Sequence, residues 1–206
     1  MEVQLNTYNA NYNSGSLIKR ILWYLVSMVF FKTSWNTLSN LKVFLLRVFG
    51  ATVGKKVVLK PNINIKYPWN LVIGNHCWIG EGVWIDNLDQ VTLEDHVCIS
   101  QGAFLECGNH NYKSSSFDLM TAPIYVKQGS WIGAKGIIGP GVTVGSHAVL
   151  SLGAVATKDL EPYTLSAYFL LPDNPLDDRS YADLYDESIK KNFINKFKVK
   201  KMGYKK

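Results

Sequence analysis

The sequence predicts a parallel β-solenoid of about five turns, in which short strands wind around one continuous core. Two observations predict it. An aliphatic residue recurs every six positions over residues 53–156, and the residue four positions later is usually small or aliphatic. This period fits neither a helix nor a strand with simple alternation, but it suits a short strand followed by a tight turn. Because each repeat buries its aliphatic side chain only against its neighbours, no single repeat could fold alone.

The six-residue repeat is interrupted three times, and each interruption follows a third repeat. The inward aliphatic positions are Val53, Leu59, Ile65, Ile73, Ile79, Ile85, Leu93, Ile99, Leu105, Val126, Ile132, Ile138, Val144, Leu150 and Ala156. If three repeats make one turn, then all three insertions leave from the same corner of a triangular prism. A glycine often follows the aliphatic residue directly, as at Gly54, Gly74 and Gly80, and we attribute it to turn conformations that bulkier residues avoid.

Residues 1–50 are predicted to form a helical extension. The segments "SLIKRILWYLVSMVFF" and "SNLKVFLLRVFG" are rich in apolar residues, and the second ends at a helix-stopping glycine, Gly50. We expect them to cover an end of the solenoid or to pack in an oligomer. The apolar run 21–31 is too short for a membrane span, which needs about 20 residues. The alternative is a helix at a membrane interface, which would use Lys19, Arg20, Trp23, Tyr24 and Lys32.

The longest interruption, within residues 106–125, carries a histidine. His76, His96 and His147 each lie three residues after an inward aliphatic residue, at turn positions that face solvent, whereas His110 lies outside the repeat. A histidine on the one long loop of a rigid scaffold is well placed for acid–base chemistry near neutral pH. His110 is therefore the candidate general base, on an active-site loop that spans residues 106–125.

Residues 165–206 are predicted to form a C-terminal extension with a short helix around 181–193 and a lysine-rich end. The formal net charge is +6, but the stretch from Ile189 holds eight lysines and no acid, and the rest of the chain carries −2. We interpret this end as a solvated tail, with contact to an anionic membrane surface as the alternative. The solenoid itself is not basic and lacks an aromatic-and-basic recognition motif, so no nucleic-acid partner is expected.

The three cysteines, Cys77, Cys98 and Cys107, show no metal-type spacing, and their odd number argues against a disulfide framework. The N-terminus lacks the cationic start and cleavage site of a signal peptide. We therefore expect a cytoplasmic protein, with peripheral contact at the inner face of the cytoplasmic membrane as the alternative.

The repeats, the "GNHNY" loop and the stretch "WIGAKGIIGPGVTVGSHAVLSLGAVATKDLEPYT" resemble the hexapeptide-repeat acetyltransferases that use acetyl-CoA. The motifs "YPW", "WIGE" and "SQGA" are similar to those of the colanic acid biosynthesis acetyltransferases, a branch close to the galactoside, maltose and nodulation-factor O-acetyltransferases. The resemblance covers residues 7–164. It implies a left-handed parallel β-helix, a homotrimer with active sites between neighbouring subunits, and metal-independent acetyl transfer from acetyl-CoA to a sugar hydroxyl in exopolysaccharide biosynthesis. The acceptor would be a sugar or a lipid-linked saccharide.

The resemblance also implies residue roles. His110 matches the family's catalytic histidine, and Lys158 matches a lysine near the nucleotide phosphates. The stretch along the pantetheine arm is matched by Trp131, Gly133, Ala134, Gly139, Gly145, Ala148, Ser151 and Ala154. Asp86 and Asn87, at the same corner as the loop, are expected to contact the acceptor. One departure is Asp177 in "DNPLD", where the family carries a lysine after Gly-Asn-Pro-Ala.

Three alternatives remain open at this point. The acceptor could be another small hydroxyl compound. A solenoid resembling the γ-class carbonic anhydrases would need three convergent histidines for zinc, but His76, His96 and His147 belong to different turns. A non-catalytic assembly solenoid would need neither the loop histidine nor the cofactor-like turns.

Overall fold

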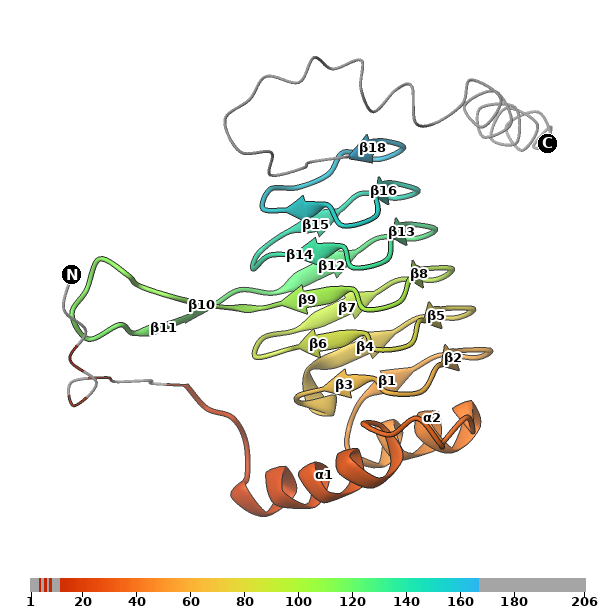
Figure 1. Ribbon diagram of the computed structural model, residues 1–206, viewed down its shortest axis with the longest axis horizontal. Helices are drawn as coiled ribbons and strands as arrows, with labels where there is room; N and C mark the ends of the chain where they lie inside the picture. The colour runs from red at the N-terminus through yellow and green to blue at the C-terminus, as the bar shows by residue number, and fades with distance from the viewer. Residues whose placement is uncertain (1–3, 5, 7, 9–11, 167–206) are drawn as a thin grey trace. The chain divides into compact units, whose positions relative to one another are not determined.

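The computed structural model describes residues 4, 6, 8 and 12–166, within a compact unit that spans residues 1–169. These residues form a stack of short strands above two helices (Figure 1). The predicted C-terminal helix, Asp177 and the lysine-rich tail lie outside the described residues.

Three parallel sheets form the walls of the stack. Sheet A contains β1 (Thr52–Val53), β4 (Leu71–Ile73), β7 (Val91–Leu93), β12 (Ile124–Val126) and β15 (Thr143–Val144). Sheet B contains β2 (Val58–Leu59), β5 (Trp78–Ile79), β8 (Cys98–Ile99), β13 (Trp131–Ile132), β16 (Val149–Leu150) and β18 (Leu165–Ser166). Sheet C contains β3 (Asn64–Ile65), β6 (Trp84–Asp86), β9 (Phe104–Glu106), β14 (Ile137–Ile138) and β17 (Val155–Ala156). The predicted parallel solenoid is therefore confirmed.

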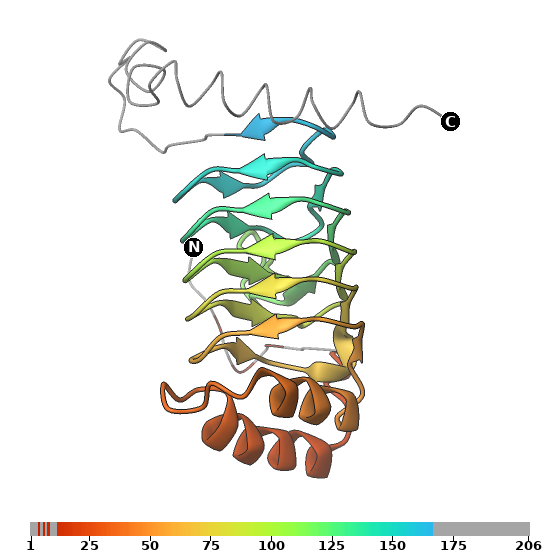
Figure 2. The same cartoon turned by 90° about the vertical axis from the view of Figure 1, so that its right-hand side faces the viewer.

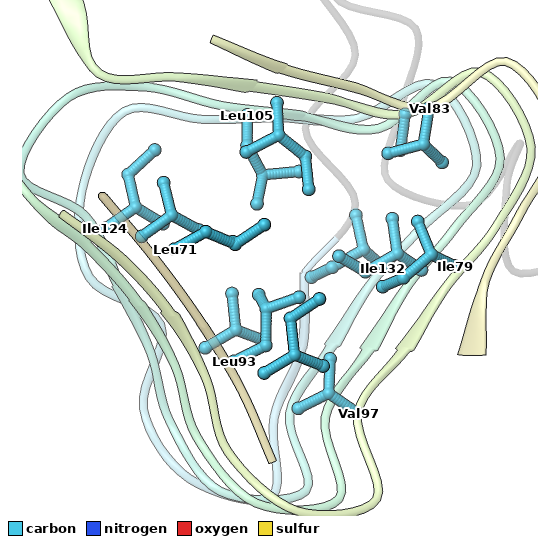
Figure 3. Packing of buried hydrophobic residues seen from close by; sticks show 14 of the residues in the cluster. Leu71, Ile79, Val83, Leu93, Val97, Leu105, Ile124 and Ile132 are labelled. Carbon is cyan, nitrogen blue, oxygen red and sulfur yellow. The ribbon is translucent and has the colours of Figure 1, made fainter. Parts of the chain in front are cut away.

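The core is built from the predicted inward positions, joined by residues that lie two positions before some of them, such as Leu71 and Ile124. Register pairs each aliphatic residue with its counterpart one coil away, as Ile79 pairs with Ile99 and Leu105 with Ile138. Leu71, Ile79, Leu93, Leu105, Ile124 and Ile132 converge inside the triangle in Figure 3, together with Val83 and Val97 from the corners. Each buried aliphatic side chain contributes about 1.5–3 kcal/mol, so the coils are stabilised by stacking rather than by any one turn.

The three insertions do leave from one corner, as predicted. Each lies where the chain passes from a sheet C strand to a sheet A strand, and we call this corner the C–A edge. The first insertion contains the 3₁₀ turn η2 (Pro68–Asn70), the second is the connection 87–90, and the third holds β10 (Gly108–His110) and β11 (Leu119–Thr121). The other corners are named B–C and A–B in the same way.

The solenoid has about six turns, one more than the sequence indicated. β18 pairs with β16, and Leu160 bridges Val144, so a further coil follows Ala156. This coil escaped the six-residue count because only four positions separate Ala156 from Leu160. The shortened corner is fastened by Asp159, whose carboxylate accepts a hydrogen bond from the Thr143 amide at 2.7 Å.

The glycines that follow the inward residues serve a purpose other than the predicted one. None of Gly54, Gly74 or Gly80 has a positive φ; the left-handed positions lie two residues later, for example at His76 and Gly82. An added Cβ would instead lie 2.6 Å from the next coil's backbone at Gly54 and 2.7 Å from it at Gly80. These glycines are needed because successive coils approach closely there.

Gly80→Ala is expected to lower the free energy of unfolding by about 1–3 kcal/mol, the usual cost of forcing an extra group into a packed site. The Cβ would meet the backbone of Ser100 and Gln101, which cannot move aside as a flexible side chain could. Gly139→Ala is the matched control, since its Cβ would meet nothing closer than 3.4 Å. Urea unfolding followed by circular dichroism measures both, and equal losses would contradict the close-approach explanation.

Two helices cover the first coil, α1 (Leu17–Phe30) and α2 (Ser39–Val48) (Figure 2). The first coil contains the edge strands β1, β2 and β3, and the backbone of each one forms a hydrogen bond with a side chain of these helices. Arg47 donates to the Val53 carbonyl at 2.7 Å, the Leu59 amide donates to Ser39 Oγ at 2.8 Å, and Trp23 Nε1 donates to the Ile65 carbonyl at 2.9 Å. Unpaired strand edges invite aggregation, so this cap protects the end of the solenoid, as expected for these segments.

Candidate active site

The long insertion forms a two-stranded arm that projects from the C–A edge (Figure 1). β10 and β11 pair antiparallel, with His110 opposite Leu119. The arm begins at Gly108, three residues after Leu105, the last inward residue of its coil, and Cys107 and Ile124 are fully buried at its base. A rigid solenoid thus holds His110 at a fixed distance from its wall.

His110 is oriented by Phe117, which lies across the turn of the arm. His110 Nδ1 lies 2.9 Å from the Phe117 carbonyl, and the two rings stack with centroids 4.3 Å apart and planes at 8°. Because a carbonyl only accepts, Nδ1 must carry the hydrogen, which leaves the lone pair on Nε2 in the neutral ring. Phe117 itself has φ 50°, a left-handed conformation that is unfavourable for a bulky residue and that often occurs at functional sites.

Gln4 and Tyr8 lie beside the arm. The Gln4 amide donates to the Ser115 carbonyl at 2.8 Å, and the Tyr8 ring lies 6.2 Å from the His110 ring. Further along, the Tyr12 hydroxyl donates to the Leu88 carbonyl at 2.6 Å on the C–A edge. His110 therefore has the Phe117 ring on one face and the Tyr8 ring beside it.

The two residues predicted to contact the acceptor differ in their surroundings. Asp86 lines a cleft of about 440 Å³ next to α1, where Lys66 Nζ lies 2.9 Å from its Oδ1 and pairs with it by charge rather than by an aligned hydrogen bond. Asn87 is fully buried, and its amide is engaged with the backbone of Tyr67 and Asn70. This corrects the expectation for Asn87, which holds the C–A edge together and does not face a ligand.

Glu106, at the base of the arm, pairs directly with Asp86 across sheet C. Burial raises the pKa of Glu106, and the nearby Asp86 carboxylate raises it further. One oxygen of Glu106 accepts a hydrogen bond from the Gly108 amide at 3.1 Å, at the start of β10. Two carboxyl groups therefore lie one above the other where the arm leaves the solenoid.

Glu106→Gln is expected to stabilise the protein near neutral pH. The raised pKa means that the folded state holds the proton more tightly than the unfolded chain. Glu106 therefore contributes stability at acid pH that is lost as the pH rises through its folded value. Glutamine keeps the oxygen that accepts from Gly108 and carries no charge, so the free energy of unfolding at about pH 7.5 should rise by about 0.2–1 kcal/mol, the range for directly opposed strand pairs.

Near pH 4 the variant and the wild type should have the same free energy of unfolding, as measured by urea unfolding. The exposed Glu81→Gln is the control, and a gain independent of pH would contradict this account.

The residues predicted to hold the cofactor lie on all three corners of the prism. Trp131, Gly133, Ala134 and Ser151 lie together at the B–C edge, where an added Cβ on Gly133 would come within 2.6 Å of the Leu152 amide nitrogen. Gly139 and Lys158 lie on the C–A edge, the edge from which the arm also leaves, but one and two coils after the arm. Gly145 and Ala148 lie at the A–B edge. The side chains of Ala148 and Ala154 are fully buried in the core, so any contact of these residues with a cofactor would be through their backbone.

Sequence reasoning missed Phe117 and Glu106. Phe117 lies inside the irregular insertion, where no repeat assigns a position, and its left-handed backbone leaves no signal in its residue type. Glu106 could have been found, since it directly follows the inward Leu105 in the same way that Asp86 follows Ile85. The two carboxyl groups therefore had to face each other in any stack with this register.

The remaining histidines and the cysteines occupy structural positions. His76 stacks on His96 with ring centroids 5.1 Å apart, and His147 stacks on Tyr163 at the same distance. Within residues 4, 6, 8 and 12–166, no three histidine, cysteine, aspartate or glutamate side chains gather closely enough to hold a metal ion. Cys77, Cys98 and Cys107 are free thiols; burial raises the pKa of each, that of Cys107 to about 12.

Known proteins resemble this chain in sequence and in fold. The chain is 35% identical over 149 residues to a protein of Escherichia coli K12 named as a colanic acid biosynthesis acetyltransferase, WcaF, and the match covers 72% of this chain and 82% of that protein. No family model matches the chain.

Two solved structures show the same fold. A maltose O-acetyltransferase from Clostridium difficile 630 superposes with a TM-score of 0.68 at 22% identity, over 77% of this chain and 87% of that one. A hexapeptide-repeat acetyltransferase from Vibrio cholerae, complexed with acetyl coenzyme A, superposes with a TM-score of 0.67 at 21% identity, over 78% of this chain and 88% of that one. These neighbours are left-handed β-helices, as predicted for this chain. With this repeat, this arm and a 35% identical relative matched over most of its length, the chain belongs to the hexapeptide-repeat acetyltransferases, in the branch of the colanic acid biosynthesis enzymes.

Proposed function

We propose that this protein transfers the acetyl group of acetyl-CoA to a hydroxyl of a sugar that is destined for an exopolysaccharide. The observation that carries the proposal is the orientation of His110, whose Nδ1 is held by the Phe117 carbonyl so that Nε2 remains free to accept a proton. The family relation supports the donor, since a solved neighbour is complexed with acetyl coenzyme A. The WcaF relative supports the class of acceptor.

In the proposed reaction, His110 Nε2 takes the proton of the acceptor hydroxyl while the hydroxyl oxygen attacks the thioester carbonyl carbon. A carbon–oxygen bond forms, the carbon–sulfur bond breaks, and the imidazolium returns its proton to the leaving thiolate. A positioned base of this kind contributes typically 10²–10⁴-fold. Fixing both substrates beside it contributes further through proximity.

Direct transfer is favoured over an acyl-enzyme because the described chain offers no activated thiol. Burial raises the pKa of Cys77, Cys98 and Cys107, and a thiol that keeps its proton is a poor nucleophile. The rings next to His110 are those of Phe117 and Tyr8, so His110 has no thiol among these ring neighbours that it could activate. The base therefore acts on the acceptor itself.

We place the acceptor beside the C–A edge, in the cleft that Asp86 and α1 line. Asp86 is largely buried and faces a cleft that also contains Lys66, Tyr67 and Trp84. Carboxylates accept hydrogen bonds from sugar hydroxyls, and aromatic rings pack against the apolar faces of sugar rings. Asp86→Asn should therefore raise KM for the acceptor more than KM for acetyl-CoA.

The cofactor is proposed to lie between two chains. In one chain the arm leaves from the C–A edge, whereas Trp131, Ala134 and Ser151 lie at the B–C edge, with sheet C between them. A cofactor on those residues would not meet the arm of its own chain. In a closed threefold assembly, the arm of one subunit can reach the B–C edge of the next, and closed symmetry is the common outcome for soluble oligomers.

The protein is accordingly expected to sediment as a homotrimer at micromolar concentration, with a mass three times its 23.2 kDa. Mixing His110→Ala and Ala134→Trp subunits should restore part of the activity, because a mixed trimer contains some interfaces with an intact histidine and an intact cofactor edge. A monomer that turns over at the full rate would contradict the shared site.

The proposed function is tested by following free thiol release from acetyl-CoA across a panel of sugars, nucleotide sugars and lipid-linked oligosaccharides. Acceptor-dependent thiol release, with an ester on the product, is the expected result. Turnover only with small non-sugar alcohols would move the assignment to another hydroxyl acceptor. No turnover with any acceptor, in a protein that also fails to bind acetyl-CoA, would favour the assembly solenoid.

A further inference from the structure

The side of α1 that does not face the solenoid is covered by exposed apolar side chains. They recur at three- and four-residue spacing along the helix, so they lie on one face, and we call them the α1 outer face. Its members are Ile18, Leu22, Leu25, Met28 and Val29, with exposed fractions from 46 to 71%. Leu17 and Ile21, at the border of this face, also line the cleft that contains Asp86. Soluble proteins rarely leave so large a contiguous apolar surface open to water unless it binds something.

This face is not needed for the cap that α1 provides. The opposite side of the helix fastens it to the solenoid through Trp23 and Ser27, which are 3% exposed. Trp23 packs edge-on against Phe31 at 5.0 Å and donates to the Ile65 carbonyl. Capping would be complete with polar residues on the outer face, so the apolar residues there indicate a second role.

The charge around α1 is mostly positive, and the one carboxylate in the neighbouring cleft, that of Asp86, is paired with Lys66. Residues 3–80 contain nine lysines and arginines and no aspartate or glutamate, whereas residues 81–188 contain fifteen acids and five basic residues. Arg20 and Lys32 are exposed at the two ends of α1, and Tyr24 is exposed between them. The end of the solenoid that carries the apolar face is therefore also its cationic end.

We infer that the α1 outer face docks onto an anionic lipid bilayer, with the helix lying in the interface. Apolar side chains on one face with basic and aromatic residues beside them are the features of an interfacial helix, and the positive end of the molecule complements anionic headgroups. α1 has 14 residues, and no helix within the described residues is long and apolar enough to cross a membrane. The helix therefore lies on the bilayer.

This inference does not depend on acetyl transfer. A second copy of the chain is the competing occupant. It is disfavoured because a twofold contact through this face would bring two cationic ends together, and like charges placed in contact oppose association.

The test is co-sedimentation of the full-length protein with phosphatidylcholine vesicles that contain about 30% phosphatidylglycerol. Wild type is expected to bind, and a Leu22→Glu/Leu25→Glu variant is expected to bind at least about tenfold more weakly, because both carboxylates would enter the interface. Leu165→Glu, at a leucine on the other end of the solenoid that is more exposed than Leu22 or Leu25, is the control and should bind like wild type. Circular dichroism should show the same fold in all three proteins.

The charge component is tested with Arg20→Gln/Lys32→Gln. This variant should lose binding to the anionic vesicles by a few-fold, and raising the salt to about 0.5 M should give a similar loss in wild type. Equal binding of wild type and the double glutamate variant would overturn the inference and assign any vesicle attraction to another basic segment. It would also be overturned if wild type bound no vesicles but sedimented as a larger oligomer than the variant, which would make the face a contact between copies.

Discussion

His110→Ala is expected to lower kcat by about 10²–10⁴-fold with little change in acetyl-CoA binding. Alanine removes Nε2, the only atom of this ring free to accept a proton, while the arm keeps its β10–β11 pairing. Thiol release measures kcat, and calorimetry measures acetyl-CoA binding.

The matched control is His147→Ala. His147 stacks on Tyr163 at the A–B edge, on a different corner of the prism from the arm. Its loss should leave kcat within about twofold, as expected for a surface substitution away from the reacting atoms. If both histidine variants retained most of their turnover, His110 would be a surface residue, and the assembly solenoid would become the better explanation.

Trp23→Ala is expected to lower the free energy of unfolding by about 3–5 kcal/mol, the usual cost of deleting a large buried aromatic side chain. Trp23 packs against Phe31 and Phe49 at centroid distances of 5.0 and 5.2 Å, and its Nε1 pairs with the free edge of β3. The variant would leave both a cavity and an unpaired carbonyl at Ile65. Urea unfolding and amide exchange of α1 measure the loss.

Trp35→Ala is the control for this prediction, since that ring is 63% exposed. It should change stability by no more than about 0.5 kcal/mol. If Trp23→Ala were equally mild, the helices would not be a structural cap. The solenoid would then be stable with its first coil uncovered.

The sequence by itself determined the solenoid, its inward residues and the corner from which the insertions leave. It could do so because a fold of identical stacked coils repeats the same physical requirement every six residues, and Ile79, Ile99 and Ile132 meet it in the same way. It also singled out His110, because the one histidine outside a regular lattice is visible without coordinates.

Only the tertiary structure decided what surrounds those residues. The Phe117 carbonyl that orients His110, the burial of Asn87 and the sixth coil at Leu165–Ser166 depend on irregular corners, where chain direction is set by contacts between coils and not by local periodicity. The close approach of backbones at Gly80 has the same origin. The α1 outer face is likewise defined by the tertiary structure, in which Trp23 fastens the other side of the helix to the solenoid. The sequence of an apolar helix indicates that the helix is covered, but it does not indicate which side packs against the solenoid.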